Sequence, residues 1–283
     1  MVKEDKNKFG SGQLLNFAKN SYLERTSRPI YALVFLIPFI VFYELGTIFI
    51  NTDVLDKSQV RVVAFVWLQR TLQYIGLGGK FAWVAPPLVV VVILVWLQLA
   101  SRKSWSVIVS DVVPMAAECI LLAGPLLVLS LFLNNSEPAA NAAVLLRQGA
   151  IVSRSLLAEL VTGVGAGIYE ELLFRLILIC LLMIIFQDLL RVGHSSAIIL
   201  SVLVSAALFS VHHHLVFLEG RFSLAAPFAW PVFIFRTIAG IYFATIFAMR
   251  GFGITAGTHG FYDILATVIN AVFFAHPGTD AQP

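Results

Sequence analysis

Apolar residues occur along this chain in long blocks that are separated by short polar segments. A block of about 20 apolar residues is long enough for a helix to cross the hydrocarbon core of a bilayer, which is about 30 Å thick. Seven blocks of this kind are predicted as membrane-spanning helices: Pro29–Ile50, Phe81–Ala100, Val112–Leu133, Ser155–Phe186, Ser196–Phe217, Pro227–Met249 and Phe252–Phe274. An eighth segment, Arg61–Gly78, contains Gln69 and Arg70 and is predicted as an interfacial helix or a short eighth element.

The composition agrees with a membrane protein. Hydrophobic residues make up 59% of the 283 positions and charged residues only 12%, which is too apolar for a soluble domain. The predicted fold class is therefore all-α, a polytopic transmembrane bundle of about 7–8 helices with an intramembrane polar site. The net charge of +3 gives no indication of nucleic-acid binding. Cys119 and Cys180 both fall within spans and are predicted as small buried residues, not as a disulfide.

The first 28 residues carry more basic than acidic side chains: Lys3, Lys6, Lys8, Lys19, Arg25 and Arg28 against Glu4, Asp5 and Glu24. By the positive-inside rule, this bias predicts a cytoplasmic N-terminus. The first apolar block starts near residue 29 and is long enough to remain as an anchor, so no cleavable signal peptide is expected. We predict an integral, multi-pass protein of the bacterial inner (cell) membrane.

A polar stretch, Asn134-Asn-Ser-Glu-Pro138, separates two halves of the chain. The predicted organisation is an N-terminal cytoplasmic tail (1–28), a scaffold of transmembrane helices (29–150), a catalytic transmembrane core (151–275) and a C-terminal tail (276–283). In the first half, Glu44, Asp111 and Glu118 lie at or near the ends of spans, where the interface can solvate them. We expect these three carboxylates to be interfacial or structural.

The second half concentrates its polar groups in three places, and the first is Gly167-Ile-Tyr-Glu-Glu-Leu-Leu-Phe-Arg175. A charged side chain at the centre of a bilayer costs at least about 2.5–3.5 kcal/mol. Glu171 and Arg175 are four residues apart with the acid first, which predicts a structural ion pair on one helix face. Glu170 is turned by about 100° from Glu171 and has no partner in its own helix, so it is the candidate for chemistry.

An alternative interpretation of these charges is a structural cluster that ties helices together. Glycines 163, 165 and 167, just before the carboxylates, would in either case let another helix approach closely.

The second polar group is Phe209-Ser-Val-His-His-His214. His213 shares a helix face with Phe209, whereas His212 and His214 point about 100° to either side. We expect one histidine, His213, to be functional, with Phe209 and His212 as candidates for support. Consecutive residues of one helix do not converge on one ion, so no metal site is predicted here.

The third group is Thr258-His259-Gly-Phe-Tyr-Asp263, in which His259 and Asp263 again share one helix face. Taken alone, this could be a satisfied polar pair. Arg236, in the preceding span, is a further intramembrane charge and a third candidate for support. Its expected partner is Glu159 or Asp263, and the sequence does not decide between them.

Together these groups are sufficient for peptide-bond hydrolysis without a covalent intermediate. A buried carboxylate and a histidine can activate a water, and a second histidine can donate to the oxyanion. A His-Glu-x-x-His metalloprotease motif and a Gly-x-Ser-x-Gly elbow are both absent from the sequence. An aspartyl protease would need two intramembrane aspartates, and Asp263 is the only one deep in the C-terminal half.

The three motifs Glu170-Glu-x-x-x-Arg175, Phe209-x-x-x-His213 and His259-x-x-x-Asp263 resemble the signatures of the CAAX protease and bacteriocin-processing family. These are intramembrane glutamic endopeptidases related to the CAAX prenyl endopeptidase. The resemblance covers about residues 155–275. It implies a helical fold in which Glu170 and His213 activate the water and His259, with residue 263, forms the oxyanion hole.

Position 263 departs from the prenyl endopeptidases, in which it is usually Asn. An ionised aspartate cannot donate a hydrogen bond to an oxyanion, so we expect Asp263 to orient His259 instead. We expect neither a cofactor nor a metal, because an arginine beside the acids would repel a cation.

The resemblance predicts an intramembrane endopeptidase that cuts a membrane-associated protein or peptide near the bilayer surface. The sequence leaves the substrate open among a prenylated C-terminus, a bacteriocin leader and a sorting tail. Two alternatives are a non-proteolytic bacteriocin-immunity or regulatory scaffold of the same fold, and a proton-coupled transporter. A transporter would show ion-dependent flux and carboxylates spread over both halves.

Overall fold

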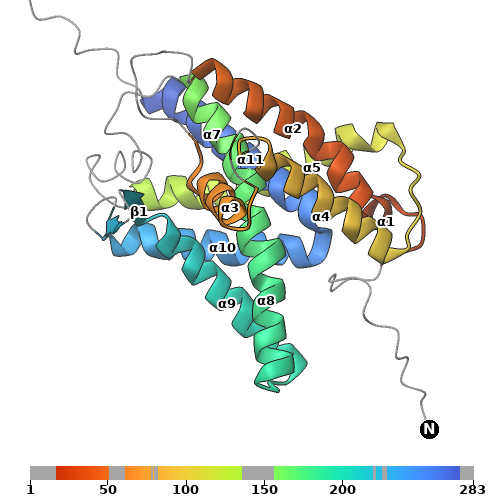
Figure 1. Ribbon diagram of the computed structural model, residues 1–283. Coiled ribbons are helices and arrows are strands. Elements are labelled where there is room, and N and C mark those ends of the chain that lie inside the picture. Colours follow the sequence, from red (N-terminus) through yellow and green to blue (C-terminus); the bar gives the residue numbers. More distant parts are fainter. Residues whose placement is uncertain are drawn as a thin grey trace, which may run out of the picture.

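The computed structural model describes residues 17–50, 61–77, 79, 82–135, 156–218, 221–224 and 228–274. Within these ranges the chain is helical apart from one antiparallel hairpin, β1 (Leu215–Leu218) and β2 (Arg221–Leu224) (Figure 1). The predicted all-α bundle is confirmed. The predicted seam at Asn134–Pro138 and the predicted boundary after residue 150 fall mostly outside the described residues, because only Asn134 and Asn135 are placed, at the end of a helix.

The helical elements follow one another along the chain as α1 (Tyr22–Thr26), α2 (Pro29–Ile50), α3 (Val63–Tyr74), α4 (Ala85–Ser101), η2 (Val109–Asp111), α5 (Val112–Asn135), α7 (Leu156–Glu171), η3 (Leu172–Leu178), α8 (Ile179–Met183), η4 (Ile184–Leu189), α9 (His194–His212), α10 (Trp230–Arg250), α11 (Phe252–Ile269) and η5 (Asn270–Phe274). The segments η3, η4 and η5 are π-helical, and η2 is a 3-10 turn.

Five helical segments in the described part of the chain are long and apolar enough to cross a membrane: Pro29–Ile50, Val109–Phe132, Leu156–Leu189, His194–His212 and Trp230–Arg250. Two of the seven predicted spans are not among these five. The predicted span Phe81–Ala100 corresponds to α4, a shorter apolar helix, and the predicted span Phe252–Phe274 corresponds to α11 and η5. The predicted span Ser196–Phe217 is too long, because α9 ends at His212 and Phe217 belongs to β1. The protein is a multi-pass membrane protein.

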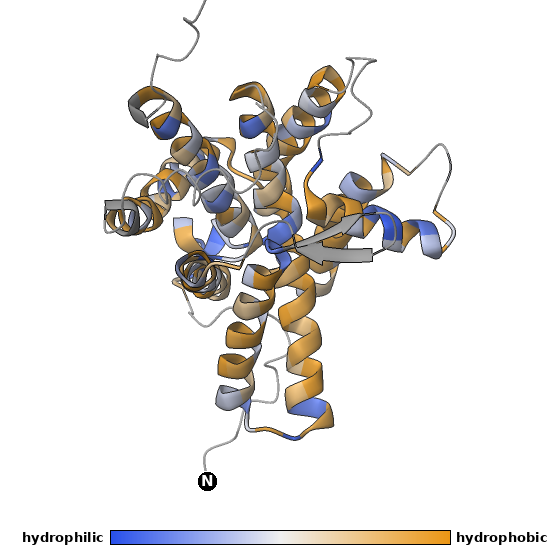
Figure 2. Ribbon diagram, turned by 90° about the vertical axis from the view of Figure 1, so that its left-hand side faces the viewer, coloured by the Kyte–Doolittle hydropathy of each residue, from blue (hydrophilic) through white to orange (hydrophobic). Residues whose placement is uncertain are grey.

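Large apolar side chains are exposed on the outer faces of these helices, among them Phe49, Leu121 and Ile199. Helices α8 and α9 extend below the rest of the bundle in Figure 1 and are hydrophobic over most of their length in Figure 2. Water would disfavour so much exposed apolar surface, whereas lipid tails solvate it. The outer surface therefore fits a bilayer.

Helix α11 occupies the middle of the bundle and packs against α2, α5, α7 and α10 (Figure 1). Its first half is buried throughout, from Phe252 to Gly260. The contact with α7 is close because Gly167 faces Gly260: a Cβ added at Gly167 would lie 2.6 Å from the backbone nitrogen of Gly260. The close helix approach predicted from the glycines is confirmed, and it brings the α7 carboxylates beside α11.

A Gly167→Ala substitution is expected to lower the stability of the protein by about 1–3 kcal/mol, because its methyl group would overlap the backbone of α11. Gly124→Ala in α5 is the matched control, since a Cβ there meets no atom within 4 Å. The control should be neutral or stabilising by up to about 1 kcal/mol. Denaturant unfolding in detergent measures both, and equal effects would contradict the close α7–α11 contact.

The short helix α1 is fixed to the ends of α5 and α10 by a polar network. Arg250 donates to the carbonyl of Leu23 at 2.8 Å and to the hydroxyl of Thr26 at 2.8 Å. The same guanidinium pairs with Glu118, which also accepts a hydrogen bond from Tyr22 at 2.8 Å. Glu118 is thus a structural carboxylate, as expected.

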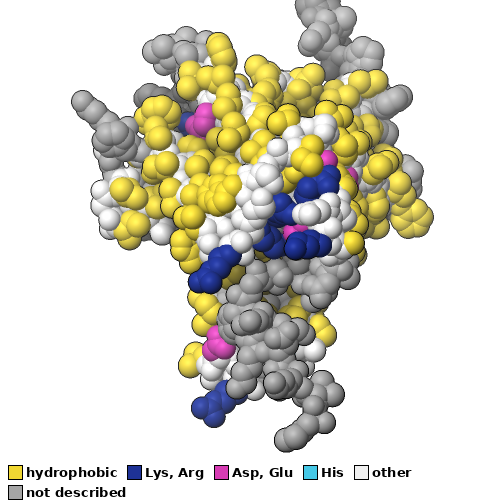
Figure 3. Space-filling view, turned by 90° about the vertical axis from the view of Figure 1, so that its right-hand side faces the viewer, with side chains coloured by type: hydrophobic (Ala, Val, Ile, Leu, Met, Phe, Trp, Pro, Cys, Tyr) yellow, Lys and Arg dark blue, Asp and Glu magenta, His cyan; other side chains and the backbone are white. Residues whose placement is uncertain are grey.

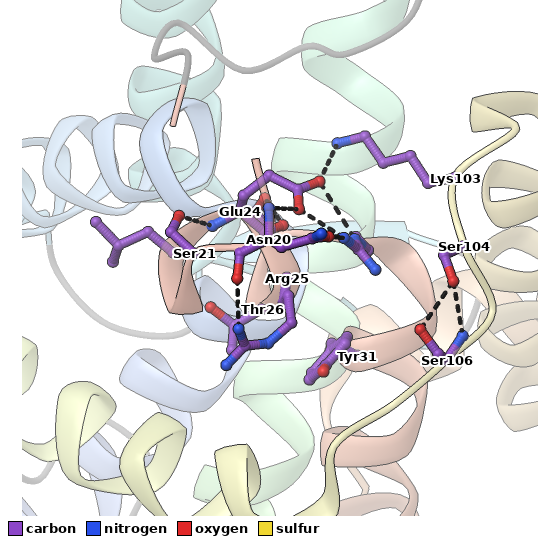
Figure 4. Close-up of polar contacts among 12 residues, drawn as sticks. Asn20, Ser21, Glu24, Arg25, Thr26, Tyr31, Lys103, Ser104 and Ser106 are labelled. Atoms are coloured by element: carbon purple, nitrogen blue, oxygen red, sulfur yellow. Dashed lines mark hydrogen bonds and ion pairs between the residues drawn. The ribbon is translucent and has the colours of Figure 1, made fainter. Parts of the chain in front are cut away.

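Further basic residues gather around α1. Arg25 donates to Asp111 at 2.9 Å, and Glu24 pairs with Arg28 at 2.6 Å. Glu24 also pairs with Lys103, at 4.0 Å (Figure 4). The hydrogen bond from Arg28 lowers the pKa of the Glu24 carboxyl from its ordinary value. Figure 3 shows a patch of Lys and Arg side chains, with acidic side chains among them, on a largely hydrophobic face. One end of the bundle is therefore polar and charged.

Candidate active site

Glu170 and Glu171 are the last residues of α7, and the helix continues as the π-helical segment η3. π-helical turns are rare and occur frequently at functional sites. One backbone carbonyl of this irregular segment, that of Phe174, accepts a hydrogen bond from the hydroxyl of Ser205 on α9 at 2.6 Å. Arg175 lies in η3, where its Nε is 3.1 Å from Oε2 of Glu171. The structure thus brings together the ion pair expected from the four-residue spacing, and both side chains are buried.

Aromatic rings enclose the guanidinium of Arg175. Its Cζ lies 4.2 Å from the ring centroid of Phe209 on α9 and 5.5 Å from that of Phe243 on α10. Nη2 also donates to the carbonyl of Gly240 at 3.4 Å. A cation over aromatic faces, paired with one carboxylate, is a favourable arrangement for a charge that has no access to water. Phe209 therefore contributes packing beneath the arginine.

Glu171 makes a second contact that the sequence did not predict. Its Oε1 lies 2.7 Å from Nδ1 of His259 on α11, and the imidazole stacks on Phe243 with the ring centroids 4.5 Å apart. Nε2 of the same ring is 3.6 Å from Oδ2 of Asp263, which is longer than a hydrogen bond. The expectation that Asp263 orients His259 is therefore corrected: the short bond that fixes the ring comes from Glu171.

Glu170 faces His213, the residue that follows the last turn of α9. Oε2 of Glu170 lies 3.5 Å from Nε2 of His213, and Nδ1 of His213 is 2.9 Å from the carbonyl of Phe209. A carbonyl can only accept, so Nδ1 carries a proton, and Nε2 presents a lone pair to Glu170 when the ring is neutral. Oε2 of Glu170 finds no hydrogen-bond partner among the described residues. With the carboxyl ionised and the ring neutral, a carboxylate oxygen and an imidazole nitrogen are both free to accept protons.

The two pairs lie side by side. The ring of Phe209 is 4.8 Å from that of His213 and 6.0 Å from that of His259, centroid to centroid, so one ring neighbours both histidines. The adjacent positions of Glu170 and Glu171 connect the pairs on the α7 side. All three sequence motifs therefore meet in one site, formed by α7, η3, α9 and α11.

Arg236 does not form the expected ion pair. Within the described residues, its side chain is more than 4.0 Å from the carboxylate oxygens of Glu159 and Asp263, and its Nη1 is buried without a hydrogen-bond partner. Asp263 instead lies against Gly163, where an added Cβ would come within 2.7 Å of the Asp263 Cβ. The role of Arg236 as support stays a prediction.

His212 lies close to His213 and Glu170, although the sequence predicted that the adjacent histidines would point apart. Its ring meets those of Trp67 and Phe174 edge to face at centroid distances of 4.7 and 5.3 Å. One potential ligand atom each from Glu170, His212 and His213 lie within 4.8 Å of one another. The expectation that adjacent histidines do not converge is wrong, because α9 ends at His212 and His213 lies in the following turn. These three residues could hold a metal ion.

A further residue that sequence analysis missed is Tyr169, which precedes Glu170. It is fully buried, and its hydroxyl donates to Oε1 of Glu44 on α2 at 3.2 Å. Oε2 of Glu44 accepts from Arg61 at 3.3 Å. Glu44 is therefore structural, and it fixes the helix turn that carries the candidate catalytic carboxylate. No local spacing signals this contact, because Glu44 and Tyr169 are 125 residues apart.

Residues 152–265 match the family model described as Type II CAAX prenyl endopeptidase Rce1-like. The matched segment contains all three motifs, so the resemblance to the CAAX protease family is confirmed. Comparison with curated proteins and with solved structures gives no match. At the level of the family, the match supports an intramembrane protease of the CAAX type, of the endopeptidase kind.

Proposed function

We propose that this protein is an intramembrane glutamic endopeptidase that hydrolyses a peptide bond in a membrane-associated protein or peptide. The observation that carries the proposal is the facing pair of Glu170 and His213, whose Oε2 and Nε2 atoms are 3.5 Å apart beside a second, oriented histidine. The family match over residues 152–265 supports the same reaction class. The pair is set among helices that can cross a membrane.

In the proposed reaction, Glu170 and Nε2 of His213 bind one water through its two protons. Glu170 takes one proton as the water oxygen attacks the peptide carbonyl, and it then delivers that proton to the leaving amine. No covalent intermediate forms. Because both groups accept protons in the resting state, the water is held with its lone pairs directed away from the pair and towards the substrate.

His259 is proposed to stabilise the oxyanion. Its Nδ1–H is bound to the carboxylate of Glu171, so Nε2 can donate to an oxyanion only when the ring is doubly protonated. Two carboxylates favour that form: Glu171 on Nδ1, and Asp263 at 3.6 Å from Nε2. In this proposal Asp263 helps to keep His259 charged, which explains how an acid can stand where prenyl endopeptidases usually have Asn.

The orientation in the membrane is part of the proposal. Arg25, Arg28, Lys103 and Arg250 gather at the α1 end of the bundle, and the positive-inside rule places this end in the cytoplasm. Location in the bacterial inner membrane stays a prediction. The proposed substrate is a membrane-associated protein or peptide that is cut in a segment close to a bilayer surface.

The reaction class is tested with the purified protein in lipid vesicles and a library of membrane-anchored peptides. Mass spectrometry is expected to detect new peptide termini that persist in the presence of EDTA and of covalent inhibitors of serine and cysteine proteases. Vesicles without the protein are the control. Loss of cleavage in EDTA with recovery on adding metal would contradict the proposed mechanism. Ion-dependent flux without new termini would identify a transporter, and neither activity would favour a scaffold.

A further inference from the structure

Beyond the residues of the proposed reaction, the site contains a buried histidine that has no role in it. Both ring nitrogens of His212 are buried without a hydrogen-bond partner among the described residues. One ligand atom of this ring lies within 4.8 Å of ligand atoms of Glu170 and His213. We propose that Glu170, His212 and His213 form a binding site for a divalent transition-metal ion of the Zn²⁺ class, and that the bound ion inhibits peptide hydrolysis.

The distances suit such an ion. Zn²⁺ binds imidazole nitrogen and carboxylate oxygen at about 2.0–2.2 Å, so two ligands of a tetrahedral ion are about 3.3–3.5 Å apart. The Glu170–His213 pair already has this separation, at 3.5 Å. A ligand atom of His212 lies within 4.8 Å of the other two. A side-chain rotation that moves this nitrogen by about 1 Å would complete a three-ligand site.

The surroundings of His212 support a ligand. The rings of Trp67 and Phe174 contact the imidazole edge to face and offer neither nitrogen a hydrogen bond in return. Buried polar atoms without a partner are rare in proteins, and each calls for an explanation. Coordination of a metal ion would satisfy one of the two nitrogens, and imidazole is a preferred ligand for Zn²⁺, Cu²⁺ and Ni²⁺.

Arg175, the arginine beside the two acids, does not oppose a cation as the sequence suggested. Arg175 is paired with Glu171, and its guanidinium lies over the rings of Phe209 and Phe243. Its charge is therefore balanced by the neighbouring carboxylate. Glu170 forms no ion pair with a described Lys or Arg, and the buried Arg236 interacts with it only at longer range. Its charge is therefore partly compensated and still available to a metal ion.

Inhibition, which rests on the proposed function, follows from the identity of the ligands. Glu170 and Nε2 of His213 are the groups proposed to accept protons from the water, and a metal ion would occupy both. In His-Glu-x-x-His metalloproteases the general-base glutamate is separate from the ligands. Here Glu171 cannot replace Glu170 as the base, because it is bound to Arg175 and His259. A bound ion would leave its water without a base.

The test measures binding and activity separately. Binding is followed by the visible absorption of Co²⁺ and by titration calorimetry with Zn²⁺ on the full-length protein in detergent. His212→Phe removes the proposed ligand and keeps a ring between Trp67 and Phe174. His214→Phe is the matched control: His214 is equally buried, with both nitrogens unpartnered among the described residues, but it is not in the cluster.

We expect stoichiometric Zn²⁺ binding by wild type, an affinity at least about tenfold lower in His212→Phe, and little change in His214→Phe. Inhibition by Zn²⁺, relative to the metal-free activity of each variant, should follow the same order. Absence of binding to wild type, or equal weakening in the two variants, would overturn the site. Binding that activates hydrolysis would overturn the inhibitory role. The calorimetry gives a result even if the protein has no protease activity.

Discussion

A Glu170→Gln variant is expected to lose peptide hydrolysis by a factor of about 10²–10⁴ in kcat, the usual contribution of a general base. Glutamine has nearly the same shape but cannot take a proton from water. The protein itself should remain folded, because among the described residues Oε2 of Glu170 makes no hydrogen bond, and its one contact of ion-pair type is with Nε2 of His213 at 3.5 Å. Replacing a buried, weakly paired carboxylate by an amide removes a desolvated charge.

The measurement is kcat and KM on a peptide that wild type cleaves, with membrane accumulation and unfolding followed in parallel. Glu159→Gln is the control on the same helix, because Glu159 lies 11 residues before Glu170, about three turns away. It should retain wild-type kinetics. If Glu170→Gln remained fully active, Glu170 would not be the base, and the structural-cluster interpretation of the carboxylates would take its place.

Much of the fold follows from the apolar blocks, because a helix that crosses a bilayer must be long, apolar and hydrogen-bonded within itself. The end of α9 was harder to predict. The apolar residues after His214 continue the helical hydropathy pattern, yet the chain turns at His213 and forms the β1–β2 hairpin. The π-helical widening at η3 has no apolar-pattern signal either, because its residues apart from Arg175 are as apolar as those of a membrane-spanning α-helix.

The site was predictable where partners share a helix. Glu171 and Arg175 lie four residues apart, and so do His259 and Asp263, so their spacing alone predicts proximity. The bond from Glu171 to His259 joins residues 88 positions apart and depends on the close contact of α7 with α11. No local pattern contains that information. The same reason explains why the convergence of His212 with Glu170 could not be predicted.

The Glu171–His259 bond gives Glu171 two roles, and a Glu171→Gln variant is expected to show both. Stability should fall by about 3–5 kcal/mol, because the buried guanidinium of Arg175 would lose its counter-charge. Activity should fall as well, by about 10²-fold or more, because an amide no longer favours the charged form of His259 that donates to the oxyanion. Denaturant unfolding in detergent and steady-state kinetics measure the two effects.

The double variant Glu171→Met/Arg175→Met separates the two roles. Replacing a buried ion pair by apolar side chains of similar volume is often neutral, so the double variant should unfold within about 1 kcal/mol of wild type. Its activity should nevertheless stay about 10²-fold low, because Nδ1 of His259 would lose its carboxylate acceptor and the ring its fixed orientation. Recovery of activity together with stability would show that Glu171 acts on the fold alone. A stable but inactive double variant would identify Glu171 as the residue that positions His259.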